Sequence, residues 1–179
     1  MSLGYLLASL PMLFPDRAPA IGVAAFVEAC AAALGPREAE AAELLATGSD
    51  APSAHPAVKA WRALEAAVAV AVGRKRLARR GGAEVVAAAP ETSACPVWLV
   101  RQVDAAFESA PDPLAREEAL LRVLWAAAED FGGFDPMAKR QVFAYAVKLR
   151  LALRRAAWDQ AVGAQRLEAA LPKAVNGEQ

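Results

Sequence analysis

The chain has 179 residues, of which 56% are hydrophobic and 22% charged, a length typical of one domain whose core needs no disulfide or metal. Alanine supplies 47 residues, whereas isoleucine occurs once and threonine twice. Alanine favours helices and β-branched residues favour strands, so the composition predicts an all-α protein, a single-domain bundle of about six helices. The 20 basic and 20 acidic residues cancel, which excludes an overall field that would attract nucleic acid or anionic lipid.

The N-terminal segment, residues 1–15, is apolar and carries no basic residue ahead of its apolar run. Pro11 and Pro15 interrupt the run early, so we expect neither a signal peptide nor a membrane span here. A run this short does not distinguish a strand from a helical turn, and both stay open. We expect a cytoplasmic protein without direct membrane insertion, at most peripheral to a membrane through a complex.

Two helices are predicted next. Apolar residues recur at helical spacing between Phe26 and Leu34, and Gly35-Pro36 ends this helix and begins the second. The second helix runs from position 36 to about 46, before Gly48. The following segment, 48–56, is rich in turn-forming residues and is expected to be a loop.

The most regular predicted element is a helix over residues 56–80, about 37 Å long. It closes with cations followed by Gly81-Gly82, as expected at the negative end of a helix dipole. Its apolar stripe consists of Trp61, Leu64, Val68 and Val72.

The next stretch, residues 83–95, is weakly patterned, and a short strand at Val85-Val86 stays open. Helices are then predicted from Pro96 to position 110 and from 113 to 131. The residues expected to be buried on them are Val97, Val100, Val103, Phe107, Leu114, Leu121, Leu124, Trp125 and Ala128.

The last predicted helix begins with Asp135 as N-cap and Pro136 at the first helical position. It extends to Leu171, about 50 Å, and residues 172–179 are expected to be a flexible tail. Its apolar residues cover more than one stripe, which indicates a central position in the bundle.

The chemistry-bearing residues do not form a catalytic motif. His55, the only histidine, lies in a predicted loop without a nearby nucleophile, and we expect it to have a loop or helix-start role. Cys30 and Cys95 lack the spacing of a zinc site or disulfide framework. The adjacent carboxylates Glu117-Glu118 and Glu129-Asp130 point about 100° apart on a helix and are interpreted as solvated. We therefore expect a non-catalytic protein without a metal or cofactor.

Charge is distributed in alternating blocks: −4 over residues 1–50, +6 over 51–80, −7 over 81–135 and +5 over 136–179. Such blocks are typical of helices that complement one another, so the cations could simply pair with the acidic block. The alternative is a forked basic surface that binds carboxylates or phosphates of a partner other than nucleic acid. The candidate partner-binding residues are Arg74, Lys75, Arg76, Arg79 and Arg80 of the first basic cluster and Lys148, Arg150, Arg154 and Arg155 of the second.

Several segments together resemble a bacterial family of unknown function whose members are encoded among the subunit genes of V/A-type (vacuolar/archaeal-type) rotary ATPases. The segments are Tyr5-Leu6-Leu7-Ala8-Ser9-Leu10-Pro11, Phe26-Val27-Glu28-Ala29-Cys30, the helix from Trp61 to Arg80, and Phe143-Ala144-Tyr145-Ala146-Val147-Lys148-Leu149 through Trp158 and Gly163. The resemblance spans nearly the whole chain and implies an accessory, assembly or structural role at the cytoplasmic side of such an ATPase, with its subunits as partners.

Two other functions stay open at this stage. The same helices would suit a stand-alone adaptor or chaperone for another cytoplasmic protein. A small-molecule enzyme would need a deep cleft lined by Cys30, His55 or paired carboxylates. A homodimer is also left open.

Overall fold

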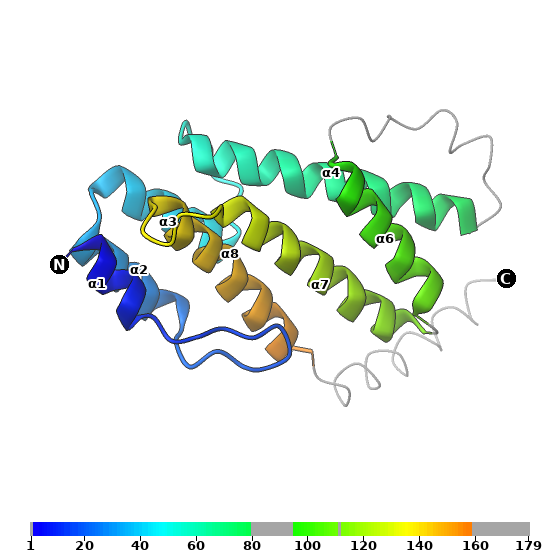
Figure 1. The fold of residues 1–179 in the computed structure, drawn as a ribbon, viewed down its shortest axis with the longest axis horizontal. Coiled ribbons are helices and arrows are strands. Elements are labelled where there is room, and N and C mark those ends of the chain that lie inside the picture. The colour runs from blue at the N-terminus through cyan, green and yellow to red at the C-terminus, as the bar shows by residue number, and fades with distance from the viewer. Residues whose placement is uncertain (1, 80–94, 111, 159–179) are drawn as a thin grey trace, which may run out of the picture.

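The computed structural model describes residues 2–79, 95–110 and 112–158, which form seven α-helices and no strand (Figure 1). The prediction of an all-α protein is confirmed for this part of the chain. The helices are α1 (Leu3–Ser9), α2 (Val23–Ala33), α3 (Pro36–Thr47), α4 (Pro56–Arg79), α6 (Val97–Ser109), α7 (Pro113–Gly132) and α8 (Lys139–Ala156).

The N-terminal segment, for which strand and helix were both open, forms the short helix α1. The side chain of Ser2 caps it by accepting a hydrogen bond from the backbone N–H of Tyr5 at 3.3 Å. Leu6 is fully buried and anchors the helix to the core. The cap satisfies one of the free N–H groups of the first turn, which favours a helix over a strand here.

The signals predicted for α3 and α4 are confirmed. Gly48 follows α3 with a φ of +68°, the left-handed conformation that glycine adopts without strain, and its N–H donates to the carbonyl of Leu44. The helix α4 has 24 residues and starts at Pro56. The segment at Val85-Val86, where a short strand was left open, lies outside the described residues.

The start predicted for the last helix is wrong. The carboxylate of Asp135 accepts from the N–H of Met137 at 2.9 Å and so caps a turn, whereas α8 begins at Lys139. At its other end α8 stops at Ala156, so it is shorter than predicted, and residues 159–179 lie outside the described residues.

The helix α8 lies centrally, packed against α7 and α3 and also touching α1 (Figure 1). Eight of its 18 residues are buried, which confirms its predicted central position. A second centre of packing is the fully buried Trp61 of α4, whose ring lies edge-on to that of Phe131 in α7, 5.7 Å between centroids. Among the described residues no charged or polar side chain is fully buried.

Two residues predicted to be buried are exposed: Val97 and Leu114. Each lies in the first turn of its helix, where no neighbouring helix covers it, and α6 instead buries Leu99 in the core. The remaining predicted positions on α6 and α7 are buried or packed against the core.

Candidate functional site

The first basic cluster joins the end of α4 to its neighbours. The amine of Lys75 lies 2.9 Å from the carboxylate of Asp104 in α6, and Arg76 lies 2.7 Å from Glu117 in α7. Arg79 donates to the backbone carbonyl of Phe107. Of the other two predicted residues, Arg74 is half-buried on α4, and Arg80 lies outside the described residues.

The second basic cluster, on α8, is also largely paired. Arg150 lies 2.7 Å from Glu65 in α4, and Arg155 lies 2.5 Å from Glu118 in α7. Arg154 lies 3.8 Å from Glu117, and Lys148 lies 3.9 Å from Glu129 with its amine 5.6 Å from the ring centroid of Trp125. Lys148, Arg154 and Arg155 therefore pair with the acidic block, as expected, whereas Arg150 pairs with the one carboxylate of the basic block 51–80.

Glu117 and Glu118 are not the solvated pair that the sequence indicated. Both side chains are partly buried, and they pair with arginines of different helices. The two oxygens of Glu117 face Arg76 of α4 and Arg154 of α8, so this carboxylate links three helices.

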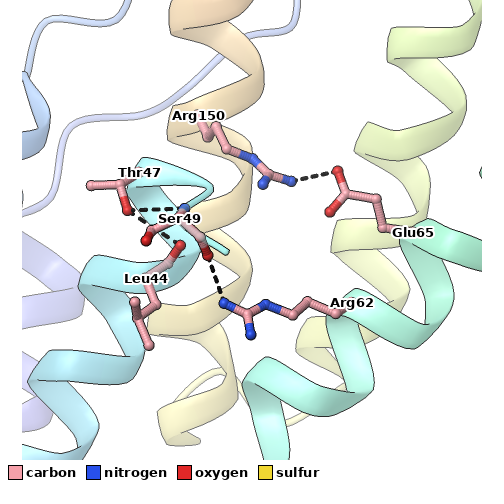
Figure 2. A network of polar contacts seen from close by, with 6 residues as sticks. All are labelled: Leu44, Thr47, Ser49, Arg62, Glu65 and Arg150. Atoms are coloured by element: carbon pink, nitrogen blue, oxygen red, sulfur yellow. Dashed lines mark hydrogen bonds and ion pairs between the residues drawn. The ribbon is translucent and has the colours of Figure 1, made fainter. Parts of the chain in front are cut away.

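Figure 2 shows the role of Arg150 at the turn between α3 and α4. Its guanidinium reaches from α8 to Glu65, while Arg62 of α4 donates to the carbonyls of Ser49 and Ala51 at 2.6 and 2.8 Å. The contacts of Arg62 fasten the loop after Gly48 to α4, and the contact of Arg150 joins α8 to α4. Arg150 thus has a structural role, because it joins two helices of the bundle.

A cleft of about 320 Å³ opens where α4, α6 and α7 meet. The guanidiniums of Arg79 and Arg116 lie over the ring of Phe107, 5.2 and 5.3 Å from its centroid. The Nε of Arg116 is buried and has no hydrogen-bond partner within the described part of the chain. We call this site, lined by Arg76, Arg79, Phe107, Pro113, Arg116 and Glu117, the arginine cleft.

Among its described lining residues, the arginine cleft brings together three guanidiniums and one carboxylate. Guanidiniums stay charged at all ordinary pH values and present a planar fork that matches carboxylate or phosphate oxygens. Because they do not exchange a proton, they are suited to bind and orient an anion rather than to transfer protons. The site therefore has the composition of an anion-binding cleft.

Sequence analysis found Arg76 and Arg79 but missed Arg116. Arg116 is one of three scattered arginines in the acidic block, and its spacing from the α4 cluster gives no hint of proximity. Its position one turn into α7, after the cap Asp112 and Pro113, was predictable. Its approach to Phe107 depends on how α6 and α7 pack, which the local pattern does not encode.

Next to the cleft lies an apolar groove of about 260 Å³ between α4, α7 and α8. It shares Arg76 and Glu117 with the arginine cleft, and Arg154 stands at the same border. Its aliphatic lining is formed by Val68, Ala69, Val72, Leu120, Leu121, Leu124 and Leu151, with Gly73 and Glu65 completing it.

His55 and Cys30, the residues considered for catalysis, are both part of the packed structure. The Nδ1 of His55 accepts from the N–H of Ala57 at 3.2 Å and its ring lies edge-on to Phe143, which confirms the predicted role at a helix start. Burial, aided by the charge of Arg37, lowers the pKa of His55 below 6.5. Burial also raises the pKa of the Cys30 thiol to about 12, so this thiol stays protonated.

Within residues 2–79, 95–110 and 112–158, no cluster of three histidine, cysteine, aspartate or glutamate side chains is arranged to hold a metal ion. None of the helices in these ranges combines the length and apolar character that a membrane span requires. No known family, curated protein or solved structure matches the chain.

Proposed function

We propose that this chain is a non-catalytic interaction protein that binds an acidic segment of a partner protein in the arginine cleft. The observation that carries the proposal is the excess of guanidiniums there: among the described residues that line the cleft, Arg76, Arg79 and Arg116 stand beside a single carboxylate, that of Glu117. Arg76 also has a side chain that is 56% exposed, so an incoming carboxylate reaches it. Charge-assisted hydrogen bonds from arginine to carboxylate are among the stronger polar contacts in proteins.

The proposed context is a V/A-type rotary ATPase, with the chain in an accessory, assembly or structural role and ATPase subunits as partners. This context is supported by the resemblance of the N-terminal motif and of α8 to the family described above. The cleft adds a chemical requirement to it, because the contacted subunit must present an exposed aspartate or glutamate. Since salt screens exposed charges over about 8–10 Å, binding should weaken as salt is raised.

The test is affinity purification of the tagged chain from its own host at low salt, with quantitative mass spectrometry. We compare the wild type with a cleft variant, Arg79→Gln/Arg116→Gln, and with a control variant, Arg101→Gln/Arg122→Gln, that removes the same charge at two exposed positions. We expect rotary ATPase subunits with the wild type and the control, and at least a tenfold lower recovery with the cleft variant.

The alternative function is that of a stand-alone adaptor or chaperone for another cytoplasmic protein. It rests on the same cleft without the ATPase context. Recovery of one non-ATPase protein that is lost only in the cleft variant would support this alternative. Equal recovery of every bound protein by the cleft and control variants would contradict both functions.

A further inference from the structure

The apolar groove beside the arginine cleft is an open surface between helices that ion pairs join at its borders. The ion pair between Arg76 and Glu117 bridges α4 and α7 at one border, and that between Glu65 and Arg150 bridges α4 and α8 at the other. Between these borders the lining is aliphatic. Aliphatic surface left open to water is costly, at about 25 cal/mol per Å², so a groove of this kind gains from an apolar occupant.

Gly73 is a second, independent observation on the same groove. It lies in the interior of α4, where glycine is less favourable than alanine by up to about 1 kcal/mol, in a chain that uses alanine 47 times. A Cβ at this position would meet no atom within 4 Å, so no contact among the described residues requires glycine. The bare backbone of Gly73 keeps the wall of the groove open.

The charges at the end of the groove decide what kind of apolar occupant fits. Arg76 and Arg154 share the carboxylate of Glu117, and the side chains of both arginines are more than half exposed. Within the described part of the chain, two positive charges thus share one negative charge at the point where the aliphatic lining ends. A ligand with an alkyl chain and an anionic group would contact the aliphatic lining with its chain and the two arginines with its charge.

We infer that the groove binds an anionic amphiphile, with its alkyl chain along Val68, Gly73 and Leu124 and its carboxylate or phosphate group between Arg76 and Arg154. At about 260 Å³ the groove is slightly smaller than the pockets of about 300–1,000 Å³ that hold drug-sized ligands. A groove of this size fits one alkyl chain of medium length but cannot enclose a sterol or a lipid with two chains. The inference goes beyond the proposed function, because it assigns a small ligand to the groove. The two sites share Arg76, but Gly73 lines only the groove and Arg79 and Arg116 line only the cleft, so each site has its own test.

The test is isothermal titration calorimetry of the full chain with sodium octanoate, decanoate and dodecanoate, each below its critical micelle concentration. We expect one site, with affinity that rises about fourfold for each added methylene until the groove is filled. Decyl phosphate should bind in the same way. Vesicles of phosphatidylglycerol and of phosphatidylcholine distinguish the sources of the ligand: sedimentation with the anionic vesicles only indicates a lipid headgroup, and sedimentation with neither indicates a free acid.

Variants locate the site. Gly73→Leu places a side chain in the groove at a position with open space, and replacement of glycine in a helix interior favours folding. We expect it to weaken decanoate binding at least tenfold, whereas Gly22→Leu, at another open glycine outside the groove, leaves binding unchanged. Arg76→Gln/Arg154→Gln should weaken binding about tenfold or more, through the loss of charged hydrogen bonds, and Arg101→Gln should not.

The inference is overturned if no fatty acid binds saturably, if affinity does not depend on chain length, or if Gly73→Leu binds decanoate as the wild type does. These outcomes leave the proposed function intact, because that function is tested through Arg79 and Arg116 and through recovery of a protein. Conversely, loss of the protein partner does not affect the calorimetric result.

Discussion

The hydroxyl group of Tyr145, in the middle of α8, donates a 2.8 Å hydrogen bond to the backbone carbonyl of Pro11. The ring of Tyr145 stacks on that of Phe26 in α2, with 5.4 Å between centroids. Burial raises the pKa of Tyr145 to about 12, so the hydroxyl remains a donor at any pH at which the protein is studied. One side chain of the central helix thus fixes the segment that connects α1 with α2.

Replacement of Tyr145 by phenylalanine should lower the free energy of unfolding by about 1 kcal/mol, and by up to about 3 kcal/mol if the carbonyl of Pro11 finds no water. Urea denaturation followed by circular dichroism measures the change. Tyr5→Phe, at a side chain that is 64% exposed, is the control and should be neutral within about 0.5 kcal/mol. Equal stabilities of Tyr145→Phe and the wild type would mean that this hydrogen bond does not contribute in solution.

The same substitution at two glycines should have opposite effects. Gly73→Ala should raise the free energy of unfolding by up to about 1 kcal/mol, because the helix gains propensity and the new Cβ meets nothing. For a chain of this size that corresponds to a rise in Tm of about 2–4 °C. Differential scanning calorimetry measures it.

Gly48→Ala should instead lower the free energy of unfolding by about 1–2 kcal/mol. Its φ of +68° is costly for any residue with a Cβ, and that Cβ would lie 2.7 Å from Nη1 of Arg150. A gain in stability at position 48 would show that the turn after α3 relaxes without its left-handed conformation.

The elements with strong local signals could be predicted from the sequence. The start of α4 at Pro56, its long apolar stripe and the stop of α3 at Gly48 depend on residues close together in the chain. These signals act within a few residues, because capping, proline geometry and glycine conformation are local properties of the backbone.

A local signal was misleading at the start of α8. Asp135-Pro136 has the sequence of a helix start, yet the amide of Gln141 donates to the carbonyls of Gly132, Gly133 and Asp135 and holds the loop in another path. Those bonds form only because the chain reverses at Gly133, whose φ is +74°. The helix therefore begins three residues later than Pro136.

The candidate site could be predicted only in part, because contacts between helices are not visible in the local sequence. The cations of α4 are visible as a cluster in the sequence, but the sequence does not show which of them are neutralised. Lys75 is paired with Asp104, whereas Arg79 faces a carbonyl and shares the ring of Phe107 with Arg116. Such pairings depend on the relative placement of α4, α6 and α7.

His55 should make stability depend on pH just below 6.5, the ordinary pKa of histidine. Burial, with the nearby charge of Arg37, lowers its pKa in the folded protein, and its Nδ1 must stay unprotonated to accept from Ala57. Between the folded and unfolded pKa values the unfolded chain binds more protons, so the free energy of unfolding falls as the pH is lowered through this window.

The comparison variant is His55→Asn, because asparagine keeps a side-chain acceptor at the helix start but does not titrate. Urea denaturation at several pH values should give a flatter profile for the variant below pH 6.5. The carboxylate of Glu38, which pairs with Lys139, titrates at a lower pH than His55, because the hydrogen bond from Lys139 lowers the pKa of Glu38 below 4.5. Its titration should therefore change the stability of both proteins only in that acidic range. Parallel profiles between pH 6.5 and 4.5 would exclude His55 as the cause.

Glu117→Gln separates two effects of this carboxylate: its ion pairs with Arg76 and Arg154, which join three helices, and its negative charge beside the proposed anion site. Its contacts with Arg76 and Arg154 are substantially exposed, and exposed ion pairs contribute about 0–1 kcal/mol, so the free energy of unfolding should fall by no more than about 1 kcal/mol. The substitution also removes the one negative charge shared by the arginine cleft and the groove. Two like unit charges about 4 Å apart in water repel each other by about 1 kcal/mol. Without the repulsion between Glu117 and the carboxylate of decanoate, the affinity for decanoate measured by calorimetry should rise about fivefold. A lower affinity would mean instead that Glu117 is needed to hold the two guanidiniums in position for the anion.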